Sequence, residues 1–193
     1  AGRAAAEMRA RKGLVLAGRT RPAVAGVEVR VWERIAGSEL EQRVGTAQTG
    51  ADGSYSVGPL GEGGQYRVEA VKAGYALRAS PEDPYVFVAS RMGEVRVEAV
   101  DGAGAGLAGV LLSLSGEAAF RQNNRTGDDG SHTFAGLVPG TYFLRPMLKE
   151  YDFKPASHTV TVAEGGAGPA IRVTARRVAY SAVGTVRTLD GVG

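Results

Sequence analysis

The chain has 193 residues, of which 44% are apolar and 22% charged, a balance typical of a folded globular protein. It contains no cysteine, which excludes disulfide frameworks, thiolate metal sites and a cysteine nucleophile. Its apolar runs, such as Val110-Leu111-Leu112, fall far short of the roughly 18 residues that a membrane-spanning helix needs. The 29 glycines follow no Gly-X-Y period, which excludes collagen, and with the many valines they are typical of short strands joined by tight turns.

The net charge of +3 comes from the N-terminal part of the chain. Residues 1–30 carry seven basic side chains and two acidic ones, so the remainder is slightly acidic. A basic segment can contact phosphates or anionic lipid, but the simpler interpretation is a solvated segment. Residues 1–12 are rich in alanine and show no strand pattern, and we expect them to form a linker or tail.

One sequence pattern occurs twice, with copies about 80 residues apart. Ala25-Gly26-Val27-Glu28-Val29 returns as Ala108-Gly109-Val110-Leu111-Leu112, and Thr49–Tyr55 returns as Thr126–His132. Tyr66 corresponds in the same way to Tyr142. We infer two homologous modules, residues 13–90 and residues 93–177, joined by a short linker near residues 89–93.

Each copy shows the alternation of apolar and polar residues that is typical of half-buried strands. Val27, Val29 and Val31 alternate with polar or amphipathic residues, and residues 66–70, 94–98 and 158–162 repeat the pattern. Asp52-Gly53 and Asp129-Gly130 supply the positive φ that a tight turn between strands demands. The sequence therefore predicts an all-β protein of tandem seven-stranded Ig-like or transthyretin-like β-sandwiches. Residues 178–193 begin with the same alternation, and we expect them to form the first strand of a truncated third module.

Two motifs that suggest ligand binding have simpler structural explanations. Residues 104–109 match G-x-G-x-x-G, but a dinucleotide site needs a helix after the motif, and residues 110–114 have the pattern of a strand. We therefore expect these glycines to connect the first two strands of the second module. Asp52, Asp128 and Asp129 supply too few oxygens for calcium, and turn aspartates of this kind commonly bond to their own backbone.

Residues suited to catalysis are scarce. The chain has only two histidines, His132 and His158, both in or beside predicted strands and without an evident carboxylate partner, and it has no G-x-S-x-G motif. We predict no enzymatic activity, no cofactor and no metal site. Trp32, the one tryptophan, is out of phase with Val27, Val29 and Val31 and is expected to face outward, which makes it a weak candidate for a sugar or partner contact.

Both copies resemble a known family of β-sandwich modules. The pattern of Gly-Val at a strand start, a Thr-x-x-Asp-Gly-Ser turn and a later Gly-x-Tyr resembles the carboxypeptidase-regulatory-like, transthyretin-like superfamily, also described as a carbohydrate-binding-like fold. The second copy resembles the nodal modulator (NOMO) family more closely, in residues 113–116, 140–157, 160–165 and 179–186. The resemblance is close over residues 107–191, while residues 13–90 resemble only the wider superfamily.

The NOMO resemblance implies a large single-pass membrane protein of the endoplasmic reticulum whose lumenal part is a chain of such sandwiches. It also implies two partners, nicalin and a small multipass membrane protein, in a complex associated with the translocon for multipass membrane proteins. We therefore expect this chain to be a non-catalytic lumenal scaffold segment that presents protein-interaction surfaces and contacts its neighbouring modules. It would bind no nucleic acid and would meet the membrane only through other parts of the protein. The alternative function is a carbohydrate-binding module.

Asn124-Arg125-Thr126 is an N-x-T sequon without proline, located just before the predicted turn at Asp129-Gly130. By itself the motif is common in a chain of this length. Combined with the resemblance to a lumenal protein, it makes Asn124 a candidate N-glycosylation site in a loop.

Overall fold

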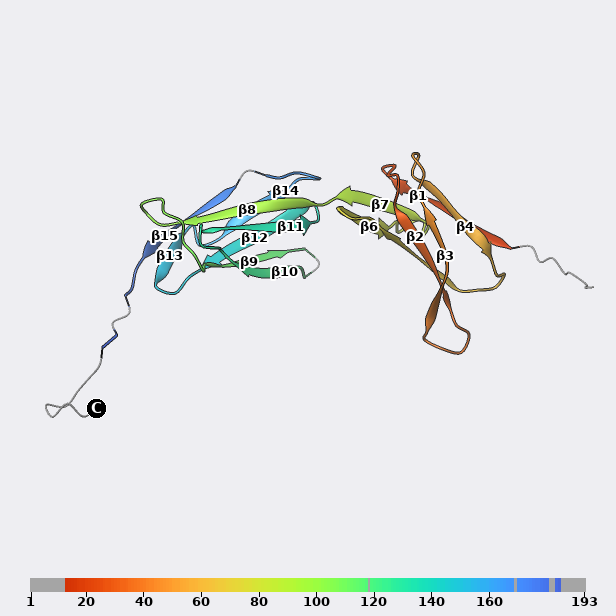
Figure 1. The fold of residues 1–193 in the computed structure, drawn as a ribbon, viewed down its shortest axis with the longest axis horizontal. Helices are drawn as coiled ribbons and strands as arrows, with labels where there is room; N and C mark the ends of the chain where they lie inside the picture. Colours follow the sequence, from red (N-terminus) through yellow and green to blue (C-terminus); the bar gives the residue numbers. More distant parts are fainter. Residues whose placement is uncertain (1–12, 118, 169, 181–182, 185–193) are drawn as a thin grey trace, which may run out of the picture. The chain divides into compact units, whose positions relative to one another are not determined.

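A computed structural model describes residues 13–117, 119–168, 170–180 and 183–184 of the chain. Within these ranges all the regular secondary structure consists of β-strands. No helix in the described residues is long and apolar enough to span a membrane. The chain forms two compact units that divide between Arg91 and Met92. The predicted all-β architecture of two tandem β-sandwiches is confirmed (Figure 1).

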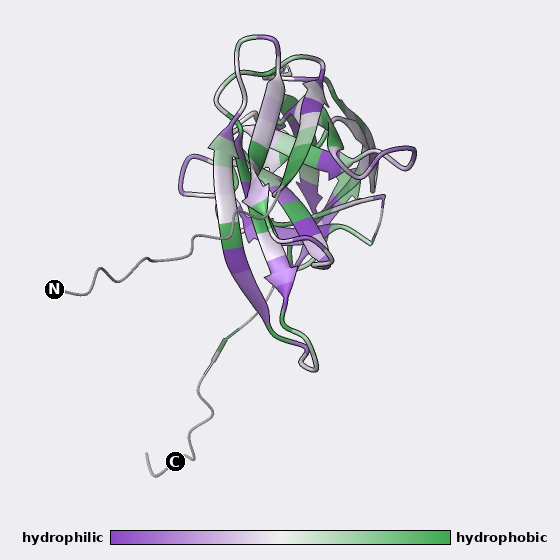
Figure 2. Cartoon of the chain, turned by 90° about the vertical axis from the view of Figure 1, so that its right-hand side faces the viewer, coloured by the Kyte–Doolittle hydropathy of each residue, from purple (hydrophilic) through white to green (hydrophobic). Residues whose placement is uncertain are grey.

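The first unit packs two sheets, with strand orders β4-β1-β7-β6 and β3-β2-β5. Val27, Val29 and Val31 are completely buried between them, as the alternation predicts, and hydrophobic and hydrophilic bands alternate along the strands (Figure 2). The strands are β1 (Leu14–Arg21), β2 (Glu28–Arg34), β3 (Glu41–Gln48), β4 (Ser54–Leu60), β5 (Tyr66–Val71), β6 (Tyr75–Ala79) and β7 (Val86–Arg91).

The second unit repeats this plan with strand orders β11-β8-β15-β13 and β10-β9-β12-β14. Leu112, Leu114, Phe134 and Leu144 form the centre of its core and are completely buried. The strands are β8 (Gly93–Val100), β9 (Leu111–Gly116), β10 (Arg121–Arg125), β11 (Ser131–Leu137), β12 (Gly140–Met147), β13 (Tyr151–Lys154), β14 (His158–Val162) and β15 (Ile171–Arg177). The first unit thus has the expected seven strands, and the second carries an additional one, β14, beside β12.

The first and last strands of each unit pair in parallel. Arg19 of β1 lies opposite Val86 of β7, and Val97 of β8 lies opposite Ile171 of β15. Because parallel strands point the same way, the chain enters each unit at one end and leaves it at the other. Only Met92 separates β7 from β8.

The turns predicted at Asp52-Gly53 and Asp129-Gly130 are present, and the glycine motif lies in a connection between strands. Gly53 and Gly130 have φ of 76° and 75°, in the left-handed region that glycine adopts readily. Residues 104–109 lie in the connection from β8 to β9, so a strand follows the glycine motif as expected. Residues 178–180 and 183–184 form no strand; the rest of the predicted third-module strand, like residues 1–12, lies outside the described residues.

A buried threonine fixes the start of β2 and, in the second copy, of β9. The Thr49 hydroxyl accepts a hydrogen bond from the Val27 N–H at 2.9 Å and donates one to the Val24 carbonyl at 2.6 Å. Thr126 makes the equivalent bonds, with the Val110 N–H at 2.9 Å and the Leu107 carbonyl at 2.6 Å. In each unit the hydroxyl satisfies a buried N–H that has no place in the strand ladder.

We predict that Thr49→Val destabilises the first unit by about 1–3 kcal/mol, because the buried Val27 N–H loses its acceptor. Trp32 fluorescence during urea unfolding measures this, since the only tryptophan lies in the first unit. Thr49→Ser is the matched control: it keeps the hydroxyl and should lose much less stability. Equal losses for the two variants would contradict the assignment.

The Asp129 carboxylate closes its turn by accepting hydrogen bonds from the Ser131 hydroxyl at 2.6 Å and the Ser131 N–H at 2.9 Å. These bonds, the hydroxyl bond first, lower the pKa of Asp129 below the ordinary aspartate value. A lowered pKa in the folded state contributes stability that is lost as the pH falls through it. The carboxylate therefore bonds its own turn, as expected of a turn aspartate.

We predict that Ser131→Ala raises the pKa of Asp129 toward its ordinary value, because the hydroxyl donor is removed. An NMR titration of the side-chain carboxyl carbons measures this. Asp52, in the equivalent turn of the first unit, serves as the internal reference and should be unaffected. An unchanged Asp129 titration in the variant would show that the hydroxyl bond is not what lowers the pKa.

Candidate protein-interaction surface

The described residues contain no cluster of three or more histidine, aspartate or glutamate side chains that would hold a metal ion. His132 lies in β11 and His158 in β14, which belong to different sheets. The Nε2 atom of each imidazole is buried and has no hydrogen-bond partner among the described residues. The structure therefore does not join either histidine to a carboxylate or hydroxyl in a catalytic arrangement.

Trp32 faces outward from β2, as its phase predicts, but its ring is partly covered by neighbours. In the strand register it lies between Arg43 of β3 and Arg67 of β5. The Arg67 guanidinium stands 5.6 Å from the ring centroid, and the indole N–H donates to a Glu69 carboxylate oxygen at 3.3 Å. Arg67 thus occupies one ring face against which a sugar could otherwise stack. The geometry around Trp32 thus favours a structural role.

Most of the remaining charges on this outer face of the first unit also pair with one another. Arg30 bonds Glu28 at 2.8 Å and Arg67 bonds Glu41 at 2.6 Å. The guanidinium hydrogen bonds lower the pKa of both carboxyls, Glu28 beside Arg30 and Glu41 beside Arg67. Salt bridges as exposed as these add little stability. Their consequence is that the β3-β2-β5 sheet offers an outside partner few unpaired charges.

The corresponding outer face of the second unit is different. Leu112 and Leu114 of β9 point into the core, so the alternating residues of β9, and those opposite them on β10 and β12, point outward. On this side Phe143 is 56% exposed and Met147 is 38% exposed. We call the following outward set the basic–apolar face: Leu111, Arg121, Arg125, Phe143, Arg145 and Met147.

The strand register arranges the basic–apolar face in rows. Met147 lies opposite Leu111, which in turn lies opposite Arg125. Phe143 lies opposite Ser115, which lies opposite Arg121. Arg145, opposite Ser113, lies between these two rows, so the apolar side chains of the face alternate with arginines. A shallow cavity of about 440 Å³ adjoins the row of Leu111 and is lined also by Leu148 and Lys149.

The charge on this face is of one sign. None of the outward positions of β9, β10, β12 and β14 carries a carboxylate. Among the described residues Arg121 and Arg145 take part in no ion pair, and Arg125 donates to the Gly109 carbonyl at 2.9 Å. Apolar side chains interspersed with arginines are typical of protein-interaction surfaces, and this set is complementary to an acidic partner.

Sequence reasoning did not identify this face, although the signal is present. Residues 140–157 were noticed for their resemblance to a family, not for the side on which their side chains lie. In β12 the buried positions are Tyr142, Leu144 and Pro146, so Phe143 and Met147 are large apolar residues in the outward phase. Apolar residues out of phase in an otherwise regular strand are the pattern that could have revealed the face.

Asn124 lies in β10 and not in a loop, so that part of the sequence expectation is wrong. Its strand partner is Leu112, which is completely buried, and opposite residues share a face of the sheet. The Asn124 side chain therefore lies on the core side of an edge strand and is half-buried. The third sequon residue, Thr126, is 5% exposed and has its hydroxyl engaged, because β10 ends against the start of β9.

Comparison with known proteins gives matches along most of the chain. The family model for a BOS complex subunit NOMO1-like β-sandwich domain matches residues 12–90, and the model for the second β-sandwich domain of that family matches residues 90–172. Mouse and human BOS complex subunit NOMO1 are each 40% identical over 96% of the chain. The chain belongs to the NOMO family. The expectation that residues 13–90 resemble only the wider superfamily is wrong, since residues 12–90 match a model of the same NOMO1-like family.

The alignments cover only part of each relative. The chain spans 15% of the length of the mouse and human NOMO1 proteins. Nicotinic receptor-associated protein 4 of Caenorhabditis elegans is 29% identical over 93% of the chain, which spans 16% of that protein. Among solved structures, the minor pilin GBS52 of Streptococcus agalactiae aligns over 85% of this chain and 88% of its own, at 18% identity and a TM-score of 0.42, too low to support a structural argument.

Proposed function

We propose that this chain is a non-catalytic scaffold segment of a NOMO-like membrane protein of the endoplasmic reticulum, facing the lumen. In this proposal it presents the basic–apolar face to a protein in a complex that contains nicalin and a small multipass membrane protein and that is associated with the multipass translocon. Family membership supports the proposal, because the mammalian relatives are named as BOS complex subunits. The single observation that carries it is the unpaired basic–apolar face of the second unit.

The architecture suits a scaffold. Each unit takes the chain in at one end and releases it at the other, which is the requirement for joining such modules in series. In repeat arrays of this kind the stabilising contacts lie within a module and with its neighbours, so outward faces are free to differ. The two units show this difference, since one outer face is closed by ion pairs and the other is not.

The chemistry of the face specifies the kind of partner. Unpaired Arg121 and Arg145 would form charge-assisted hydrogen bonds with carboxylates, and these are stronger than bonds between neutral groups. Phe143 and Met147, on either side of Arg145, would lose their exposed area to apolar contacts beside those carboxylates. We therefore expect an acidic protein surface that carries apolar residues beside its carboxylates.

Carbohydrate binding remains the alternative because of one observation. Phe143 is exposed, and in the register it lies between Ser115 and Thr159, whose hydroxyls share its face. An aromatic ring beside hydroxyls is an arrangement that can stack against a sugar. Unlike the protein-partner proposal, this alternative leaves the arginines of the face without a role.

We predict that Arg121→Glu with Arg145→Glu reduces capture of nicalin by the chain about tenfold, because reversed charge repels an acidic partner. The measurement is affinity capture from detergent-solubilised microsomes, with partners quantified by mass spectrometry. Arg78→Glu is the matched control: Arg78 is exposed on β6 of the first unit, and its reversal should leave capture unchanged. Undiminished capture by the double variant would show that the basic–apolar face is not the contact.

The same capture experiment separates the alternative. Absence of nicalin and translocon subunits from the wild-type capture, together with retention on a glycan array that Phe143→Ser abolishes, would replace the scaffold proposal with carbohydrate binding. Absence of both would overturn both functions for these two units.

In the lumen Asn124 would be a candidate for N-glycosylation. Since the sequon is folded into β10 with a buried Thr126 hydroxyl, we expect glycosylation to precede the pairing of β10 with β9. We predict that purified oligosaccharyltransferase modifies a synthetic peptide of residues 119–131 and leaves the folded chain unmodified, as read by mass spectrometry. Equal modification of peptide and folded chain would show that the native sequon is open to the enzyme.

A further inference from the structure

A strand position that is filled in the second unit is empty in the first. β12 lies between β9 and β14, whereas β5, its counterpart, pairs with β2 alone. The counterparts match residue by residue, because Tyr66 lies opposite Glu33 and Tyr142 lies opposite Gly116 of the repeat. The connection from β6 to β7 covers only residues 80–85, while that from β13 to β15 covers 155–170 and contains β14.

The missing strand leaves the first core open along β5. In the second unit β14 contributes Val160 and Val162 to the core, and Tyr142 and Leu144 beside them are buried. In the first unit the equivalents of those two residues, Tyr66 and Val68, pack against the core but are only half-buried. An incoming strand would therefore bury apolar surface as well as form backbone hydrogen bonds.

The backbone of β5 presents unpaired groups at this edge. The Arg34 N–H donates to the Gln65 carbonyl at 3.0 Å, which places the carbonyl of Gln65 toward β2. In an antiparallel pair successive residues point their N–H and C=O groups to opposite sides. Tyr66, Val68 and Ala70 thus direct theirs to the free edge, where the described residues supply no neighbouring strand.

This edge also lacks two features that commonly block strand pairing, bulges and prolines. β5 pairs with β2 in unbroken register from Tyr66 to Val71 and contains no proline. Edge strands β3 and β4 of the same unit pair through irregular register, and β4 contains Pro59. The remaining edge strand, β6, corresponds to β13, which is also an edge strand in the second unit. Among the described strands of the first unit, β5 is therefore the one edge strand whose counterpart has a further neighbour.

We propose that the β5 edge of the first unit binds an extended segment of a partner protein as an added antiparallel strand. The inference deepens the proposed function and rests on it for the source of the partner. β14 shows which segment fits: Val162 lies opposite Gly140, Val160 opposite Tyr142 and His158 opposite Leu144. Since residues 140–144 correspond to residues 64–68 in the repeat, the added strand lies opposite residues 64–68. It places β-branched apolar residues toward the core at alternate positions.

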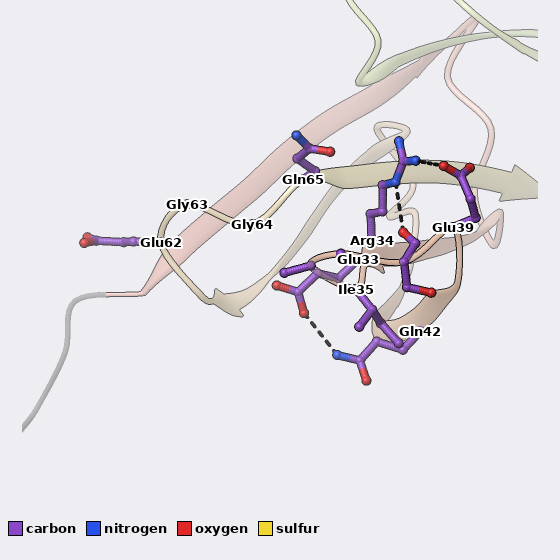
Figure 3. A pocket seen from close by; sticks show the side chains of 12 residues that line it. Glu33, Arg34, Ile35, Glu39, Gln42, Glu62, Gly63, Gly64 and Gln65 are labelled. Atoms are coloured by element: carbon purple, nitrogen blue, oxygen red, sulfur yellow. Dashed lines mark hydrogen bonds and ion pairs between the residues drawn. The ribbon is translucent and has the colours of Figure 1, made fainter.

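The end of the edge specifies a charge for the occupant. A cavity of about 900 Å³ adjoins Gly64 and Gln65 at the start of β5 (Figure 3). Three carboxylates line it, those of Glu33, Glu39 and Glu62, and its one basic lining residue, Arg34, is paired with Glu39. Because the occupant runs antiparallel to β5, its C-terminal end arrives here. We expect a lysine or arginine directly after the added strand.

The first test uses the full chain and a synthetic peptide of residues 157–163 followed by lysine in place of Glu164. We expect the peptide at millimolar concentration to slow hydrogen exchange of the Tyr66 and Val68 amides at least tenfold in NMR spectra. The peptide ending in the native Glu164 should bind severalfold more weakly because of the carboxylates. No added protection of these amides by either peptide would overturn the proposal.

A proline at the edge provides the matched comparison. Val68→Pro removes an N–H that points to the free edge, so the β2 ladder is kept while the added strand is blocked. Ala70→Pro is the control: its N–H also points to the free edge, and its counterpart is Pro146, beyond the stretch of β12 that pairs with β14. We expect Val68→Pro to abolish peptide protection and Ala70→Pro to retain it. Equal protection in both variants would overturn the proposal. If Val68→Pro does not fold, the peptide titration of the wild-type chain decides the proposal.

Capture from microsomes separates this inference from the proposed function. Loss of a partner by Val68→Pro but not by Ala70→Pro, with the basic–apolar face intact, would support strand addition. Full retention by Val68→Pro of every partner that the wild type recovers would overturn strand addition and leave the scaffold function standing. Recovery of no partner by the wild type would overturn the scaffold function, while the peptide titration would still decide the inference.

Discussion

The parallel pairing of the first and last strands is the constraint on which each unit depends. β1 with β7, and β8 with β15, form the centre of one sheet, so each of these strands has a neighbour on both sides. The pairing brings together residues from the two ends of a module, which makes the module fold as a whole. It also sends the chain out at the end opposite to its entry. The second sheet of each unit carries no connection to a neighbouring module, and its outer face is free to vary.

The two outer faces differ although they derive from one repeat. With Tyr66 aligned to Tyr142, Arg67 corresponds to Phe143 and Glu69 to Arg145. In the first unit Arg67 covers Trp32 and Glu69 accepts its indole hydrogen bond, so cation, ring and carboxylate satisfy one another. In the second unit the cation Arg145 stands in place of the Glu69 carboxylate, and the aromatic ring of Phe143 stands in place of the Arg67 cation. No internal pairing of that kind is available there, which is why charge and apolar area remain for a partner.

The sequence predicted what depends on neighbours along the chain. The burial of Val27, Val29 and Val31, the turn at Gly130 and the outward phase of Trp32 follow from period-two alternation and backbone preference, which are local. It did not predict what depends on the strand alongside. Asn124 was expected in a loop because nothing in its own segment shows that β10 pairs with β9. The basic–apolar face was missed for the same reason, since its rows join residues from three strands.

The open edge of β5 likewise depends on the strand alongside and not on the local sequence. Residues 158–162 were predicted as a strand from their own alternation, yet only the register shows that they complete the β12 edge, and only comparison with the first unit shows what is missing there. An uncovered regular edge with apolar residues beside it is an aggregation hazard, which proteins usually limit with a bulge, a proline or an inward charge. β12 carries Pro146 just where its pairing with β14 ends. β5 has Ala70 at that position, so its edge stays open along its whole length, as a strand that receives a partner must be.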